Sequence, residues 1–295
     1  MQKNIFSPDN AKSLANLELK AKLVVEGFIT GIHKSPYHGF SAEFSEHKQY
    51  RPGDEIRKLD WGVYARTNKF YIKQFEEETN LRSTLIVDSS KSMSYFSGDN
   101  PSKYNYSIFL AASLAFMLNM QRDAVGLVIF NEVIEKYMPP KSTGSYVGEL
   151  IKQLENNIPS NKTSTSESLN SIVMKIKRRS LIVIISDFFD ELSSIESVLN
   201  NFRHYNHEVI LFQVLDPKEI EFDFGQNVSF KDLETDEELI TSPHHIKIEY
   251  KKLVNNYIEN LKSICYNKKI DYNLVLTNEP FDKALLKFIK KRNNI

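Results

Sequence analysis

Cysteine is almost missing from this chain, since Cys265 is the only one among 295 residues. A single cysteine excludes an internal disulfide and any cysteine-based zinc site. Cys265 falls in a helix-like pattern, and we predict that it is a small buried hydrophobic residue. The seven histidines are too loosely spaced to form the tight cluster that zinc requires. The sequence therefore gives no indication of zinc chemistry.

Net charge and long hydrophobic runs are missing as well. Lys plus Arg and Asp plus Glu number 38 each, so the overall charge does not favour nucleic acid or an anionic membrane as a partner. The longest apolar run, from Ile108 to Met120, is too short and too polar to span a bilayer, and it predicts a buried core helix. The first residues contain no apolar signal segment. We expect a cytoplasmic protein with no membrane span and no nucleic-acid partner.

Common catalytic signatures are also absent: the sequence has no P-loop, no G-x-S-x-G elbow and no G-x-G-x-x-G fingerprint. It contains instead an alternation of short apolar strands with longer helical segments. Strands are predicted at 85–87, 125–130, 181–185, 209–214 and 272–276, with 133–138 as an antiparallel edge strand. Helices are predicted at 103–121, 145–156, 166–177, 191–203, 246–267 and 281–291. Strands rich in β-branched residues and separated by helices predict an α/β fold with a doubly wound, mostly parallel sheet.

The N-terminal part of the chain has a different pattern. Residues 11–32 have helical spacing, residues 33–67 are rich in turn-forming residues and charge, and residues 70–75 read as a strand. This part is too poor in apolar residues to form its own core. We therefore predict that residues 1–80 form a helix and a small β-containing extension packed on an α/β domain at 81–295. Residues 217–243 are acidic and less regular.

The most informative residues follow two of the predicted strands. Asp88, Ser90 and Ser92 come just after the strand at 85–87, and Asp187 follows the strand at 181–185. Because an open parallel sheet binds ligands beyond the carboxyl ends of its strands, we expect these oxygens to meet at one edge. Mg²⁺ prefers oxygen ligands and takes few carboxylates, and Mn²⁺ and Ca²⁺ share the preference for oxygen. The sequence predicts a divalent-cation site, with Mg²⁺ expected and Mn²⁺ or Ca²⁺ as alternatives.

The spacing Asp88-x-Ser90-x-Ser92 resembles the metal-ion-dependent adhesion site of von Willebrand factor A domains. Residues 123–130 resemble the second-strand signature of those domains. The resemblance implies a set of five site residues, in which three hydroxyls bind the ion directly and two acids act through water. The hydroxyls are those of Ser90, Ser92 and Thr163, and the acids are Asp88 and Asp187.

Some of these assignments have alternatives. Ser164 or Thr165 could take the place of Thr163, and each of these could instead be the N-cap of the next helix. An Asp at a strand end such as Asp88 is often only a cap or a turn former. Lys91, between the two site serines, would bring a cation near the metal, and we predict that it points to solvent.

A longer motif narrows the resemblance. Residues 46–61, from Glu46 to Trp61, resemble the signature of the MoxR-associated von Willebrand factor A-like family, long catalogued as a domain of unknown function. The segments Asp216-Pro-Lys-Glu219 and 230–235 resemble its C-terminal half, so the likeness covers roughly residues 15–292. It implies a non-enzymatic adaptor for a MoxR-type AAA+ ATPase, in chaperone-like assembly or metal-centre insertion. An acidic side chain of the partner would complete the metal shell.

Two other functions remain open from the sequence. The first is a Mg²⁺-dependent phosphoryl-transfer enzyme of the haloacid dehalogenase type, whose first strand also ends on an Asp. Those enzymes resemble D-x-D there, whereas this chain has Asp88-x-Ser90, and a hydroxyl cannot serve as an acid or base near neutral pH. The second is a scaffold with a vestigial metal site.

Overall fold

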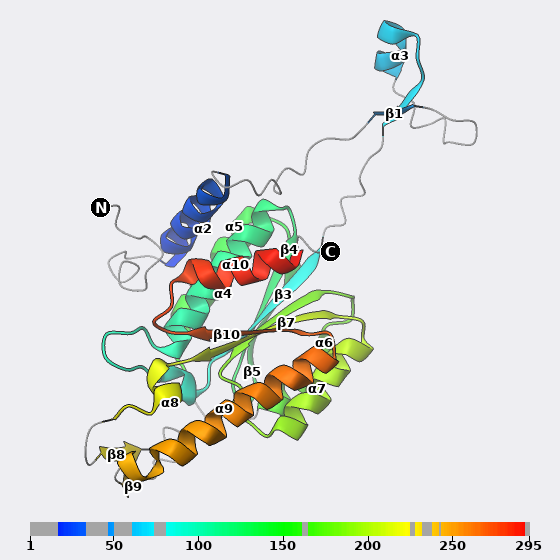
Figure 1. Cartoon of the computed structure of the whole chain (residues 1–295). Coiled ribbons are helices and arrows are strands. Elements are labelled where there is room, and N and C mark those ends of the chain that lie inside the picture. The colour runs from blue at the N-terminus through cyan, green and yellow to red at the C-terminus, as the bar shows by residue number, and fades with distance from the viewer. Residues whose placement is uncertain are drawn as a thin grey trace.

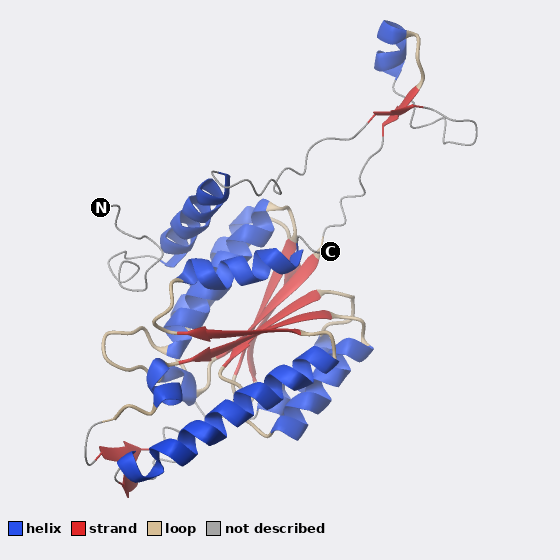
Figure 2. Cartoon of the chain, in the orientation of Figure 1, coloured by secondary structure: helices blue, strands red, loops and turns tan. Residues whose placement is uncertain are grey.

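A six-stranded sheet, in the order β10-β7-β6-β3-β4-β5, forms the centre of the computed structural model (Figure 1). The structure describes residues 17–33, 47–49, 61–73, 81–160, 165–224, 228–231, 238–241 and 243–292. Helices cover both faces of the sheet (Figure 2). The predicted α/β class with a mostly parallel sheet is confirmed.

The strands of this sheet are the ones that the sequence predicts. The parallel strands are β3 (Arg82–Asp88), β4 (Ala124–Phe130), β6 (Leu181–Ser186), β7 (Glu208–Leu215) and β10 (Asp271–Leu276). The predicted antiparallel edge strand is β5 (Ile134–Lys141), which pairs with β4. All carboxyl ends of the parallel strands therefore lie at one edge of the sheet.

Two hydrophobic cores lie on opposite faces of the sheet. Leu85 and Val87 of β3 enter the first core, and Ile86 between them enters the second. The neighbouring strands alternate in the same way. Because both faces are covered, the central strands are apolar throughout, as is usual for parallel sheets.

Each core is closed by its own helices. On the first face lie α2 (Leu17–His33), α4 (Lys103–Met120), α5 (Gly144–Asn156) and α10 (Phe281–Arg292); on the second lie α6 (Thr165–Lys175), α7 (Leu192–His204) and α9 (Pro243–Asn267). α4 packs between the sheet and α2, which explains its long apolar run. Within the described residues no helix is both long and apolar enough to cross a membrane.

Several short elements were not predicted. They are α3 (Trp61–Thr67), the 3₁₀ turn Lys91–Ser94, α8 (Pro217–Glu221) and the β8–β9 hairpin (Val228–Lys231 with Glu238–Thr241). The described parts of the segments at 33–67 and 217–243 are thus more regular than the composition of these segments indicates. Elements of four to seven residues are too short to show a helical or strand period.

The N-terminal part meets the core through α2, whose Ala21, Val24 and Val25 join the first core. The predicted strand at 70–75 appears as β2 (Tyr71–Lys73), paired with β1 (His47–Gln49). Figure 1 draws β1 and α3 apart from the sheet. Most of the 46–61 motif lies outside the described residues, and the domain boundary at residue 80 stays a prediction.

Candidate metal centre

The candidate site lies at the carboxyl ends of two central strands. β3 and β6 pair in parallel with Val87 opposite Ile185, so Asp88 and Ser186 end the strands at the same level. Ser186 Oγ donates a hydrogen bond of 2.5 Å to Asp88 Oδ2. This bond links the two strand ends directly, and it was not anticipated from the sequence.

Asp88 is fully buried, and both of its carboxylate oxygens accept hydrogen bonds. Oδ1 accepts from Ser90 N at 2.8 Å, while Oδ2 accepts from Ser186 Oγ. Burial raises the pKa of Asp88 to about 7, and the nearby charge of Asp187 adds to the rise. The bond to Ser90 N is the side-chain turn typical of Asp, and it bends the chain back over the end of β3.

Two hydroxyls converge beside these acids. Ser90 Oγ and Ser92 Oγ lie 3.1 Å apart, and Ser92 Oγ donates to Asp187 Oδ2 at 3.0 Å. Met93, in the 3₁₀ turn that carries Ser92, is fully buried in the first core and anchors the turn there. The structure thus brings together Asp88, Ser90, Ser92 and Asp187 at one edge of the sheet.

Thr163 lies outside the described residues, and its place as the third hydroxyl ligand stays a prediction. The chain on both sides of it reaches the same edge. Ser160 N donates to Ser89 O at 2.9 Å, and Ser166 N donates to Asp190 Oδ2 at 3.2 Å. Ser89 adjoins Ser90, and Asp190 lies just beyond Asp187 in the loop that follows β6.

A buried lysine also reaches this edge. Lys103, the first residue of α4, is only 1% exposed, and its Nζ donates to Asp187 Oδ2 at 2.8 Å and to Glu219 Oε1 at 2.7 Å. Burial lowers the pKa of Lys103, but the charges of Asp187 and Glu219 outweigh it and hold the pKa above its usual value. Sequence reasoning considered Lys91 and missed Lys103. The available signal was that Lys103 is the one charged residue of α4.

A second buried acid supports the edge from the adjacent strand. Asp216, after β7, accepts from Ser97 N at 3.1 Å, Ser97 Oγ at 2.5 Å and Thr277 Oγ1 at 3.2 Å. It also caps α8, while Glu219 Oε2 accepts from Asp216 N at 2.8 Å in a capping box. These contacts join the loop after the 3₁₀ turn to the ends of β7 and β10. They give the Asp216–Glu219 motif a structural role.

The donor set at this edge fits a hard divalent cation. Among the described residues no cluster of three or more His, Cys, Asp or Glu side chains is suited to a metal ion. The oxygens that converge there are the hydroxyls of Ser90 and Ser92, while each oxygen of Asp88 and Asp187 already accepts a hydrogen bond from the protein. Ser90 and Ser92 would therefore hold the ion, and the acids would orient them.

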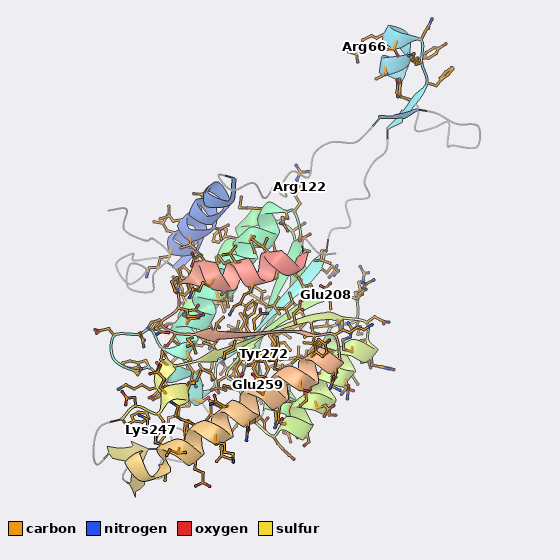
Figure 3. All side chains as sticks on the ribbon, viewed as in Figure 1. Arg66, Arg122, Glu208, Lys247, Glu259 and Tyr272 are labelled. Atoms are coloured by element: carbon orange, nitrogen blue, oxygen red, sulfur yellow. The ribbon has the colours of Figure 1, made fainter. Side chains whose placement is uncertain are left out.

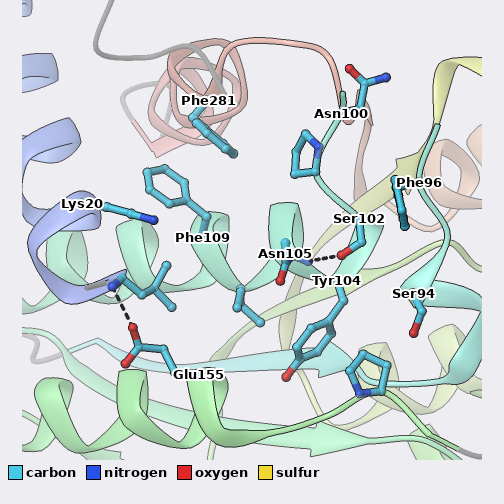
Figure 4. Close-up of a pocket in the computed structure, with 14 residues that line it drawn as sticks. Lys20, Ser94, Phe96, Asn100, Ser102, Tyr104, Asn105, Phe109, Glu155 and Phe281 are labelled. Carbon is cyan, nitrogen blue, oxygen red and sulfur yellow. Dashed lines mark hydrogen bonds between the residues drawn. The ribbon is translucent and has the colours of Figure 1, made fainter. Parts of the chain in front are cut away.

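A hollow of about 770 Å³ lies on the first face, among α2, α4 and the start of α10 (Figure 4). Its walls include Phe109, Phe281 and Lys20, all labelled in Figure 4. Leu17 N donates a hydrogen bond of 2.7 Å to Glu155 Oε1 among the lining residues. The walls of the hollow do not include Asp88, Ser90, Ser92 or Asp187. The hollow nevertheless adjoins the loop that follows the site, because Ser94 and Phe96 are among its walls.

The sheet order and the helices on both faces define an α/β protein with a mostly parallel, doubly wound sheet, and the candidate site lies at its oxygen-rich edge. The chain belongs to the family described as "Protein of unknown function DUF58", whose sequence profile matches residues 46–258. The resemblance to a family catalogued as a domain of unknown function is confirmed to this extent.

Several known proteins are similar to this chain in sequence or in fold. An uncharacterized protein of Mycobacterium tuberculosis is 26% identical over 235 residues, which cover 79% of this chain and 73% of that protein. An aerotolerance-related membrane protein from Bacteroides fragilis has a similar fold, with a TM-score of 0.50, 16% identity, and coverage of 73% of this chain and 100% of that chain. The SpRpn10 VWA domain matches with a TM-score of 0.43 and 7% identity, over 70% of this chain and 94% of that chain.

Proposed function

We propose that this protein is a non-enzymatic interaction module that binds a divalent cation, Mg²⁺ above all, at the carboxyl edge of its sheet and docks a partner's carboxylate there. The observation that carries the proposal is the convergence of Ser90 Oγ and Ser92 Oγ beside Asp187. Neutral hydroxyl ligands leave a divalent ion with positive charge and an open position. A Glu or Asp of a partner is the ligand that satisfies both.

The anchoring of the acids favours docking over catalysis. A general base needs a carboxylate free to take a proton from a substrate. Asp88 has both oxygens bound within the protein, and Asp187 accepts from Ser92 Oγ, Phe189 N and Lys103 Nζ. The position where the phosphoryl-transfer enzymes carry their second acid holds Ser90.

The loops around the site present apolar side chains to solvent. Phe96, Val133, Ile158 and Phe189 are 60%, 62%, 79% and 41% exposed, and all lie on loops at this edge. We call them the apolar rim. Exposed aromatic and aliphatic groups around a polar centre are typical of protein-interaction surfaces. The partner that fits is a protein surface with an acidic residue flanked by apolar ones.

The identity of the partner rests on the family resemblance alone. It points to a MoxR-type AAA+ ATPase in the cytoplasm, which this module would link to a client during complex assembly or metal-centre insertion. The sheet edge supplies the docking point, whichever client is involved.

Replacing Asp88 by alanine tests the proposal. We expect partner capture to require Mg²⁺ and to fall at least about tenfold in the variant, because the ligand-bearing turn loses its anchor. The measurement is capture of a purified MoxR-type ATPase by the immobilised protein, in Mg²⁺ and again in EDTA. Circular dichroism checks that the variant is folded.

Two further variants make the result specific. Ser92→Ala removes one hydroxyl at little cost to the fold and should act like Asp88→Ala. Glu208 lies at the start of β7, at the edge of the sheet opposite the candidate site (Figure 3). The control variant Glu208→Gln should therefore leave capture of the partner unchanged. Full capture by Asp88→Ala, or equal capture in EDTA, would contradict the proposal and favour a scaffold with a vestigial site.

The apolar rim gives an independent prediction. Ile158→Ser and Phe96→Ser should each weaken the affinity for the partner by about tenfold, since truncating an exposed anchor of an interface has that order of effect. Titration of the partner against each variant, in constant Mg²⁺, gives the dissociation constants. Tyr266→Ser is the control, because Tyr266 is 83% exposed at the end of α9, near the opposite edge. A rim contact is disproved if all three variants bind alike.

A further inference from the structure

Lys103 places a permanent positive charge next to the candidate cation site. Its Nζ shares Asp187 Oδ2 with Ser92 Oγ, at 2.8 and 3.0 Å. One carboxylate oxygen therefore separates the lysine from a hydroxyl that would hold the ion. The side chain is 1% exposed, so water does little to screen this charge.

The surroundings of Lys103 keep it both charged and in place. A buried ammonium persists only when it is paired, and here it has two carboxylates, Asp187 and Glu219. The rings of Tyr95 and Phe189 lie 6.0 and 5.6 Å from Nζ. With 1% of its side chain exposed, Lys103 is almost closed off from solvent.

The negative charge of Glu219 partly offsets the positive charge of Lys103. Glu219 Oε1 accepts from Lys103 Nζ at 2.7 Å, and Glu219 Oε2 is held by the backbone N–H of Asp216 at 2.8 Å. The charge near the cation site thus depends on Lys103 and Glu219, which have opposite signs. Neither of them is a proposed ligand of the ion. Removing either one changes the field at the hydroxyls in a predictable direction.

We propose that Lys103 lowers the affinity of the free protein for a divalent cation, so that the ion is held firmly only when a partner's carboxylate joins it. Two like charges at close range in a buried site repel strongly, and a partner's negative charge offsets that repulsion. This inference rests on the proposed function, because it concerns the same cation site. It makes metal binding and partner binding mutually dependent, each raising the affinity for the other.

The test is Mn²⁺ binding to the full chain, measured by the loss of the free-ion paramagnetic resonance signal and by calorimetry. Lys103→Met should tighten binding by about tenfold, and Glu219→Gln should weaken it by a similar factor. The double variant removes one charge of each sign and should return close to the unmodified protein. Ser92→Ala should bind no Mn²⁺ in any background.

Opposite signs separate a charge effect from a structural one. If both single variants weaken Mn²⁺ binding, Lys103 only holds the site together and the inference is overturned while the proposed function stands. If neither the unmodified protein nor Lys103→Met binds Mn²⁺, the inference and the proposed cation site both fail. Should Lys103→Met not fold, the double variant is compared with Glu219→Gln alone, and tighter binding in the double variant is the supporting result.

Discussion

Replacing Asp216 by alanine is expected to destabilise the protein by about 3–5 kcal/mol, because it leaves several buried donors without an acceptor and removes a helix cap. Ser97 N, Ser97 Oγ and Thr277 Oγ1 all donate to this fully buried carboxylate. Urea unfolding followed by circular dichroism gives the free energy. Partner capture should fall with it, since the loop after the 3₁₀ turn would lose its tether.

The matched control for this prediction lies a few residues further on. Asp223 is exposed, and its carboxylate forms an ion pair of 3.0 Å with Lys247, which lies near the start of α9 (Figure 3). Exposed ion pairs contribute little, so Asp223→Ala should leave the unfolding midpoint unchanged. An unfolding midpoint of Asp216→Ala equal to that of Asp223→Ala would show that the buried contacts do not hold the β7–α8 corner.

Replacing Gly126 by alanine is expected to destabilise the protein by about 3 kcal/mol, because no space exists for a side chain there. A Cβ on Gly126 would lie 2.7 Å from Met138 O and 2.8 Å from Pro140 N, which are backbone atoms of β5. The β4–β5 register already shifts between Val125 and Leu127. The edge strand would have to move, and thermal unfolding would show the loss.

Gly148→Ala is the same substitution at another glycine, and we expect it to stabilise the protein rather than destabilise it. Gly148 lies inside α5, and a Cβ there would meet its nearest atom, Glu18 Oε1, at 3.4 Å. Alanine favours a helix over glycine by about 1 kcal/mol, so this variant should be more stable than the unmodified protein. A stable Gly126→Ala would mean that β5 does not pack against β4 as closely as the distances indicate.

The strands were predictable because parallel strands buried on both faces are runs of β-branched and aliphatic residues. Their ends were less so. β3 was predicted from residue 85, yet it begins at Arg82, because Ser83 and Thr84 pair with Leu181 and Ile182 of β6. Ser83 and Thr84 are fully buried despite their hydroxyls. Because residues 82–84 are polar, the apolar pattern did not indicate that they belong to the strand.

The candidate site was predictable where its residues are close in sequence or end a strand. Asp88, Ser90 and Ser92 share one motif, and Asp187 follows a clear strand. The contacts of Lys103 with Asp187 and Glu219 were not predictable, since nothing local in the sequence pairs the first residue of α4 with two later loops. Their meeting depends on the strand order, which places β6 and β7 beside β3.

The bonds at this edge also set an order of events during synthesis. Ser92 and Asp187 are 95 residues apart, and Lys103 and Glu219 are 116 residues apart. A growing chain that has not yet added β7 and α8 cannot pair Lys103 with both acids, and long-range pairings of this kind form late. The candidate site is therefore completed only after most of the sheet has assembled.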